Sequence, residues 1–184
     1  MAQVVVVYHS GYGHTTKQAE AAAKGAGADL IAIDANGDIS DADWAKLDAA
    51  EAIIFGSPTY MGTVSWQFKK FADATSKKWF MQEWKNKVFA GFTNSATMNG
   101  DKGSTIAYFV TLAMQHSGIW VGTGLMPANS KAAKHGDVNF VGGFGGALMT
   151  TPSDASADEV NAGDLETARL LGVRVAETAA SFKG

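Results

Sequence analysis

Short apolar runs alternate along the chain with longer segments in which apolar residues recur at helical spacing. The first run consists of four valines followed by Tyr8, the composition of a strand buried on both faces of a sheet. Similar runs predict strands over Val4–Tyr8, Leu30–Ile33, Ile53–Gly56, Val88–Phe92 and Ile119–Val121. The intervening segments predict helices over Thr15–Ala26, Ser40–Ala50, Ser65–Ala74 and Thr105–His116. A long loop to about Ser153 and a final helix, with apolar positions from Leu165 to Phe182, complete the pattern.

Five strands alternating with five helices predict an α/β protein with a mainly parallel sheet. No shift in composition and no Pro- or Ser-rich linker divides the chain, so we expect a single domain over residues 1–184. In such sheets ligands bind outside the carboxyl ends of the strands, near the point where the strand order reverses. The loops after the first, third and fourth strands are therefore the candidates for a site.

Composition excludes several classes of function. The chain is 46% apolar and 18% charged, which is typical of a globular protein. Its net charge of −3, without a basic cluster, argues against nucleic acid as a partner. The absence of cysteine excludes disulfides, thiol catalysis and cysteine metal sites. No apolar stretch approaches the roughly 20 residues that span a bilayer, and the first residues lack the pattern of a signal peptide, so we expect a cytoplasmic protein without membrane insertion.

The loop after the first strand has the composition of a phosphate-binding turn. Hydroxyl residues stand at both ends, glycines lie between them, and the loop leads directly into a helix, whose N-terminus attracts anions. It matches neither the glycine pattern of dinucleotide folds nor the nucleotide P-loop. An ordinary capped turn is the alternative. The histidine in this loop has no second ligand at metal spacing, so no metal site is expected. The candidate residues are Ser10, Gly11, Tyr12, Gly13, His14 and Thr15.

Two further loops could hold a flat polar ring. The loop after the third strand offers main-chain groups and an aromatic side chain; its candidates are Pro58, Thr59, Tyr60, Met61 and Gly62. The loop after the fourth strand is polar throughout; its candidates are Asn94, Ser95, Ala96, Thr97, Met98 and Asn99. Each loop also has an alternative interpretation without a ligand: the first would simply cover the end of the sheet, and the second would be an ordinary solvated surface loop. Taken together, the three loops predict a ligand with a phosphate at one end and a planar heterocycle at the other.

Three segments carry a resemblance to a known family: Tyr8–His14, Ala52–Thr59, and Thr111–Ala113 ahead of His116. With these segments the chain resembles the flavodoxin-like FMN proteins, and among them the tryptophan-repressor-binding-protein type of NAD(P)H:quinone oxidoreductase. The resemblance implies a doubly wound, five-stranded parallel sheet of order 2-1-3-4-5 with helices on both faces. It also implies FMN as cofactor, NAD(P)H as co-substrate and a homo-oligomer, a tetramer or dimer.

By the same resemblance, the three loops would hold the FMN. His116 would lie at the flavin face, with Gln115 as the alternative, and Trp79 would cover the flavin of a neighbouring subunit; His116 and Trp79 are thus the catalytic candidates. The sequence departs from the family pattern at Tyr60, where many relatives have an arginine. The stretch between the second and third strands is also shorter, and Gly142–Gly146 lacks the family's acidic residue.

The resemblance implies an FMN-dependent enzyme that reduces quinones with NAD(P)H by two-electron, ping-pong transfer. The cofactor would carry the redox chemistry, and the protein would bind and orient it. Two alternatives stay open: a non-enzymatic electron carrier of the flavodoxin type, and a scaffold or regulatory protein that retains the fold.

Overall fold

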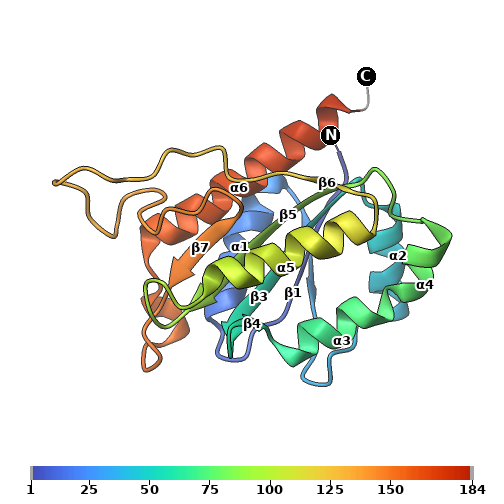
Figure 1. The fold of residues 1–184 in the computed structure, drawn as a ribbon, viewed down its shortest axis with the longest axis horizontal. Helices are drawn as coiled ribbons and strands as arrows, with labels where there is room; N and C mark the ends of the chain where they lie inside the picture. The colour runs from blue at the N-terminus through green and yellow to red at the C-terminus, as the bar shows by residue number, and fades with distance from the viewer. Residues whose placement is uncertain (1, 183–184) are drawn as a thin grey trace.

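The main sheet is parallel and has the predicted strand order. A computed structural model describes residues 2–182 of the chain, so residues 1, 183 and 184 of the predicted domain lie outside the description. Five strands follow the order β2-β1-β3-β5-β6 (Figure 1). Their bounds are β1 Val4–Tyr8, β2 Asp29–Ala32, β3 Ala52–Tyr60, β5 Val88–Ser95 and β6 Ile119–Trp120. This order confirms the predicted doubly wound parallel sheet of order 2-1-3-4-5.

Two short strands extend the predicted sheet. Strand β4 (Thr63–Val64) pairs antiparallel with the end of β3, and β7 (Ala147–Thr150) pairs parallel with β5. Met61 and Gly62 connect β3 to β4 with φ angles of 46° and 85°. Two successive positive φ angles are typical of the tight turn that joins twisted antiparallel strands. The predicted third strand therefore ended too early, because Ser57–Tyr60 continues it as far as this hairpin.

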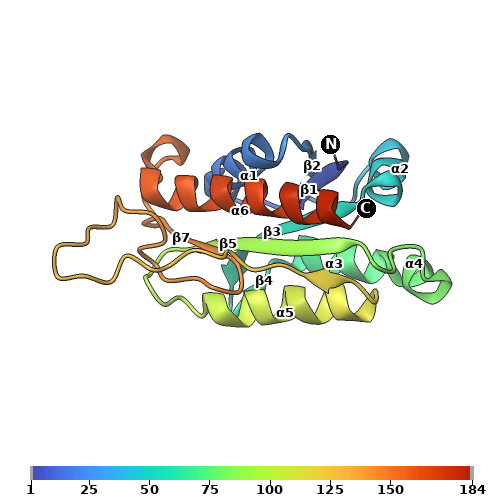
Figure 2. The same cartoon turned by 90° about the horizontal axis from the view of Figure 1, so that it is seen from above.

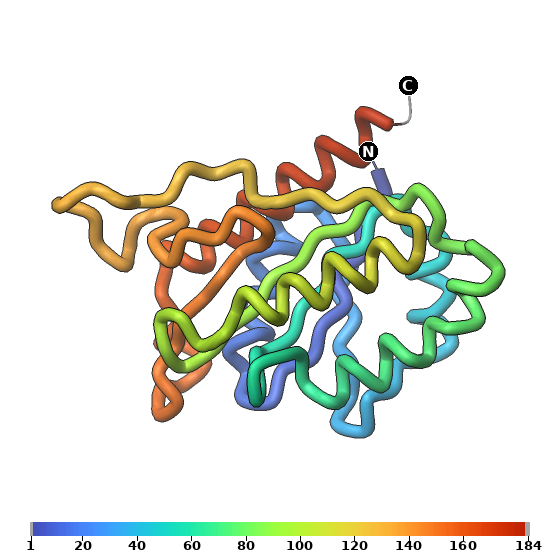
Figure 3. The backbone as a smooth tube through the Cα atoms, viewed as in Figure 1, coloured from blue at the N-terminus to red at the C-terminus, as the bar shows by residue number. Residues whose placement is uncertain are grey.

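The fifth strand position is divided between two segments of chain. Strand β6 pairs with the beginning of β5, and β7 pairs with its end, from Phe92 to Ser95. The chain between them, residues 121–146, which we call the excursion, projects from the sheet edge (Figure 3). Its two ends meet where the N–H of Thr123 donates to the carbonyl of Phe144 at 2.9 Å. The predicted loop up to Ser153 is therefore wrong over β7, which is part of the sheet.

Helices cover both faces of the sheet (Figure 2). Helices α1 (His14–Ala26) and α6 (Ala162–Ser181) pack against one face, which receives Val4 and Val6 of β1. The other face receives Val5 and Val7, because successive side chains of a strand point to opposite sides. It is covered by α2 (Asp41–Ala49), α3 (Trp66–Ala74) and α5 (Lys102–Gln115). A short helix α4 (Ser76–Met81) and a 3-10 turn (Ala157–Glu159) were not predicted.

Local sequence explains where helices begin. The hydroxyl oxygens of Ser40 and Ser65 accept hydrogen bonds from the N–H groups of Asp43 and Phe68, which caps the first turns of α2 and α3. Helix α5 begins at Lys102, three residues before the predicted start. This earlier start brings the first turn of α5 to the end of β5, where the candidate loops gather.

Candidate functional site

A cavity of about 230 Å³ opens at the carboxyl ends of the parallel strands. It brings together side chains from all three predicted loops, which are separated by up to about 85 residues in the sequence. A fourth segment, directly after β7, completes the wall. The lining residues are Ser10, Tyr12, His14, Thr15, Pro58, Thr59, Tyr60, Asn94, Ser95, Ala96, Thr151 and Ser153.

The loop before α1 is shaped around the hydroxyl of Ser10. Its Oγ accepts hydrogen bonds from the N–H groups of Gly13 at 3.0 Å and Thr16 at 3.3 Å. Gly13 has a φ of 87°, which favours glycine, and its position is the N-cap of α1. The first turn of α1 contains no acidic residue, so the partial positive charge of its N-terminus is not neutralised locally. This end of the cavity is therefore suited to an anion such as a phosphate.

His14 connects this loop to the fourth segment. Its Nε2 atom lies 2.8 Å from the carbonyl oxygen of Ala155, and its side chain is buried. Three residues further along α1, Lys17 forms an ion pair with Asp158 at 2.9 Å. These contacts hold residues 155–158 against the start of α1. Among residues 2–182 no three histidine, aspartate or glutamate side chains gather as a metal-ligand group.

The opposite wall of the cavity is built from β3 and β5. The Oγ1 atom of Thr59 lies 2.8 Å from the Oγ1 atoms of both Thr93 and Thr105, so its hydroxyl is held by two neighbours. The phenol of Tyr60 approaches Gly11 so closely that a Cβ added there would lie 2.5 Å from its oxygen. Burial raises the pKa of Tyr60 above its ordinary value, so its phenol, which is protonated at neutral pH in any case, stays a hydrogen-bond donor to higher pH.

Two buried polar atoms at the cavity have no hydrogen-bond partner among residues 2–182. They are Oδ1 of Asn94, a residue only 6% exposed, and Oγ1 of Thr151, which is 1% exposed. Buried polar groups are nearly always hydrogen-bonded, so unpaired ones at a cavity indicate a ligand that supplies partners. FMN has a phosphate at one end and a planar ring edge with alternating N–H and carbonyl groups at the other. The residues present therefore fit FMN.

Several predicted residues lie beside the cavity without lining it. Met61 is fully exposed at the β3–β4 turn, and Gly62 has open space around it. Gly11 and Gly13 shape the backbone of the first loop, as described above. Residues 97–99 lie further along the loop after β5, and the carbonyl of Thr97 accepts a hydrogen bond from Ser95 Oγ at 3.1 Å. These residues therefore do not line this cavity, and the contacts with FMN predicted for them stay predictions.

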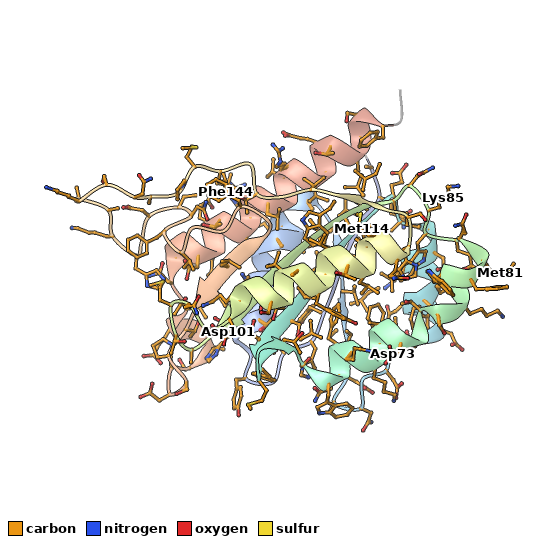
Figure 4. The ribbon with its side chains drawn as sticks, viewed as in Figure 1. Asp73, Met81, Lys85, Asp101, Met114 and Phe144 are labelled. Carbon is orange, nitrogen blue, oxygen red and sulfur yellow. The ribbon has the colours of Figure 1, made fainter. Side chains whose placement is uncertain are left out.

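The structure does not bring His116 and Trp79 to this cavity. Both border a shallow groove at the far end of α5, together with Gln115, about 20 Å along the helix from its first turn. Figure 4 labels Asp101 and Met114 near the two ends of this helix. His116 is 3% exposed, and its Nε2 lies 2.9 Å from Thr75 Oγ1. Within one chain these side chains therefore lie too far from the cavity to contact a ligand there.

Sequence reasoning missed Thr151 and Ser153, because they were placed in an unstructured loop. A signal for them is present: the hydroxyl residues of 150–153 follow the apolar run Ala147–Met149, as polar residues follow the other strands. If that run is interpreted as a strand, its end lies at the same edge of the sheet.

A second cavity, of about 750 Å³, shares the lining residue Tyr60 with the first. It is lined by Tyr60, Met61, Thr63, Val64, Trp66, Lys69, Lys70, Asp73 and Tyr108.

The fold and the cavity define the chain as a flavodoxin-like protein with a site for FMN. Comparison with known proteins agrees. The model of the family "NADPH-dependent FMN reductase" matches residues 13–132. The chain superimposes on a crystal structure of "the flavodoxin, WrbA-like protein from Agrobacterium tumefaciens" with a TM-score of 0.83 and 52% identity, covering 98% of this chain and 99% of that one.

Curated relatives carry two kinds of name. "Flavodoxin FldP" of Pseudomonas aeruginosa is 57% identical over 176 residues, covering 96% of both chains. An "NAD(P)H dehydrogenase (quinone)" of Rhizobium rhizogenes is 34% identical over 202 residues, covering 99% of both. The chain belongs to the NADPH-dependent FMN reductase family, and its predicted resemblance to the tryptophan-repressor-binding-protein type is confirmed. It is an FMN-dependent, flavodoxin-like oxidoreductase by family, and FMN is its cofactor. No helix among residues 2–182 is long and apolar enough to cross a membrane.

Proposed function

We propose that this protein is an NAD(P)H:quinone oxidoreductase. The observation that carries the proposal is the second cavity, which is open, mainly apolar and shares the lining residue Tyr60 with the FMN site. A flat substrate that must approach the flavin needs such a space, whereas a simple electron carrier needs only an exposed flavin edge. Full-length relatives named NAD(P)H dehydrogenase (quinone) support the same reading.

FMN supplies two-electron redox chemistry when bound, and this chain binds and orients it. The first turn of α1, with Ser10 and Thr15, would hold the phosphate. Asn94 Oδ1 and Thr151 Oγ1 would bind the edge of the ring system. Tyr60, between the two cavities, would contact both the cofactor and the incoming substrate.

Substrate recognition would rest on the second cavity. The side chains of Trp66, Met61 and Tyr108 offer apolar surface to a planar ring. Lys69 and Lys70 lie at the same cavity and are half exposed, each paired with an aspartate: Lys69 with Asp73 at 2.5 Å and Lys70 with Asp38 at 2.7 Å. Nicotinamide and quinone would occupy this space in turn.

A flavodoxin-type electron carrier is the second candidate, favoured by the relative named flavodoxin at 57% identity. The two functions differ in how the protein-bound flavin is reduced. For an oxidoreductase, NADH or NADPH alone should bleach the flavin absorbance within seconds, and benzoquinone should restore it. Steady-state double-reciprocal plots should be parallel, as for a ping-pong reaction. A carrier would bleach with dithionite but not with either nicotinamide, and that result would overturn the proposal.

The resemblance also implies assembly of several copies. We propose that Trp79, which is exposed beside a shallow groove, lies at a contact with a neighbouring subunit. In such an assembly it would reach a flavin held by another chain, since it cannot reach its own. His116 is enclosed by Thr75 and Trp84, so we infer for it a role in supporting this surface.

A further inference from the structure

Lys102 is a buried lysine directly behind the cavity wall. It is the first residue of α5, it is 1% exposed, and no sequence pattern singled it out. A cation at the N-terminus of a helix is opposed by the helix dipole, and a buried charge costs free energy unless it is paired. Its ammonium is compensated by the loop: Nζ donates to the carbonyls of Thr97 at 2.6 Å and Met98 at 3.0 Å.

These two bonds close the loop that follows β5. The carbonyl of Thr97 accepts from Ser95 Oγ as well as from Lys102 Nζ, so one acceptor connects the lysine to a residue of the cavity wall. Gly100 and Asp101 have φ angles of 50° and 52°, which turn the chain back sharply. A Cβ on Gly100 would lie 1.9 Å from Ser95 Oγ. The loop is therefore folded tightly over Ser95 and fastened by Lys102.

A buried carboxylate stands behind the adjacent wall. Asp164, in the first turn of α6, is 1% exposed, and its Oδ2 accepts from the N–H of Thr150 and from His135 Nε2, both at 3.0 Å. Thr150 precedes Thr151, which lines the cavity. Burial lowers the pKa of Lys102 to about 8, while the charge of Asp164 opposes that shift. Two opposite charges thus anchor the ends of β5 and β7, which together form one side of the site.

We propose that Lys102 is a positioning residue of the FMN site. By holding the carbonyls of Thr97 and Met98, it keeps Ser95 and Ala96 in the geometry that binds the flavin. Its positive charge also favours the electron-rich, reduced form of a cofactor bound on the other side of this wall. The inference concerns FMN binding and potential, so it does not depend on whether the protein reduces quinones.

The chain contains a matched control for this role. Lys87 is also buried, and its Nζ donates to carbonyls of Leu47, Asp48 and Ala50 at the end of α2. It makes the same kind of contact as Lys102, but at the amino ends of the strands, away from the cavity. Replacing Lys87 removes an equivalent structural clamp without touching the site.

The test compares Lys102→Met, Lys102→Gln and Lys87→Met with the wild-type protein. FMN affinity is measured by flavin fluorescence titration, the midpoint potential by dye equilibration, and the stability of the apoprotein by thermal unfolding. We expect Lys102→Met to weaken FMN binding at least tenfold and to shift the potential to more negative values. Lys102→Gln, which keeps a donor but no charge, should shift the potential similarly with a smaller loss of affinity.

Lys87→Met should lower the unfolding temperature and leave both flavin measurements unchanged. If Lys102→Met does not fold, Lys102→Gln carries the comparison. The proposal is overturned if the Lys102 variants bind FMN with wild-type affinity and potential, or if Lys87→Met changes both to the same extent.

Discussion

The Nε2 atom of His116 lies 2.9 Å from the Oγ1 atom of Thr75. The hydroxyl of Thr75 donates its own proton to the carbonyl of Ala72 at 2.7 Å, so the imidazole must be the donor in its contact with Thr75. The proton of the neutral ring therefore resides on Nε2. Nδ1 is left as a buried lone pair that finds no partner in the part of the chain that the structure describes. Burial lowers the pKa of His116 to about 4, and the ring is neutral at physiological pH.

This arrangement predicts acid sensitivity. The unfolded chain, with a histidine pKa of about 6.5, binds a proton at His116 between pH 6.5 and 4, while the folded protein does not. The free energy of unfolding should therefore fall as the pH drops through this range. Urea unfolding of the wild type and of His116→Gln at pH 7 and pH 5 measures the effect. The glutamine variant should lose less stability on acidification; an equal loss in both proteins would contradict the prediction.

Thr151→Val should have opposite effects on the empty and the flavin-bound protein. The change removes a buried hydroxyl that has no partner among the described residues of the chain, and such a group costs about 1–3 kcal/mol. We expect the apoprotein to unfold at a higher temperature and FMN affinity to fall about fivefold, or roughly 1 kcal/mol. Thr123→Val is the control, because that hydroxyl donates to Gly143 at 2.8 Å. It should destabilise the protein without changing flavin affinity; a destabilised Thr151→Val apoprotein would refute the assignment.

Gly13→Val should damage the phosphate end of the site. The φ of 87° at this position is unfavourable for a branched side chain, and a Cβ would lie 3.0 Å from Ala157. FMN affinity should fall at least tenfold, about 1.4 kcal/mol, with the fold retained by circular dichroism. Gly136→Val, in the excursion and with open space around it, should bind FMN normally. Unchanged titration of the Gly13 variant would mean that the phosphate binds elsewhere.

Trp79→Ala tests assembly. We expect the wild type to scatter light as a dimer or tetramer and the variant to shift toward the monomer, because an exposed indole at an interface loses its packing. Quinone use should weaken by about 0.5–1.5 kcal/mol, the contribution of an aromatic pair, with FMN still bound. Phe182→Ala, which removes another exposed aromatic ring, serves as control. A wild-type monomer at micromolar concentration that turned over quinone would rule out a shared site.

The central strands could be predicted from the sequence because burial on both faces leaves a continuous apolar signature, as in Val4–Tyr8. The extension of β3 beyond Gly56 could not be predicted in this way. Pro58 lacks an N–H donor and is normally excluded from central strands. It is tolerated here because the pairing of β3 with β1 ends at Gly56, which leaves Pro58 with a neighbour in β5 alone.

The three loops of the site could be predicted from strand ends and hydroxyl or glycine content. Lys102 and Asp164 could not, because charged residues at helix starts are mostly solvent-exposed. Their burial depends on how α5 and α6 meet the ends of β5 and β7, which only the tertiary structure determines. The role proposed for Trp79 likewise rests on contacts between chains, about which a single chain's pattern of residues gives no information.

The meeting of Thr123 and Phe144 makes the excursion an insertion that does not disturb the strand it interrupts. Asn139 and His135 fasten it to Thr167 and Asp164 of helix α6, and its tip, residues 129–132, is its longest continuously exposed stretch. The length of that tip is therefore free to vary without shifting the register of β7. A foreign peptide grafted there should leave the flavin cavity intact, which would make this tip an attachment point for coupling the redox centre to another protein.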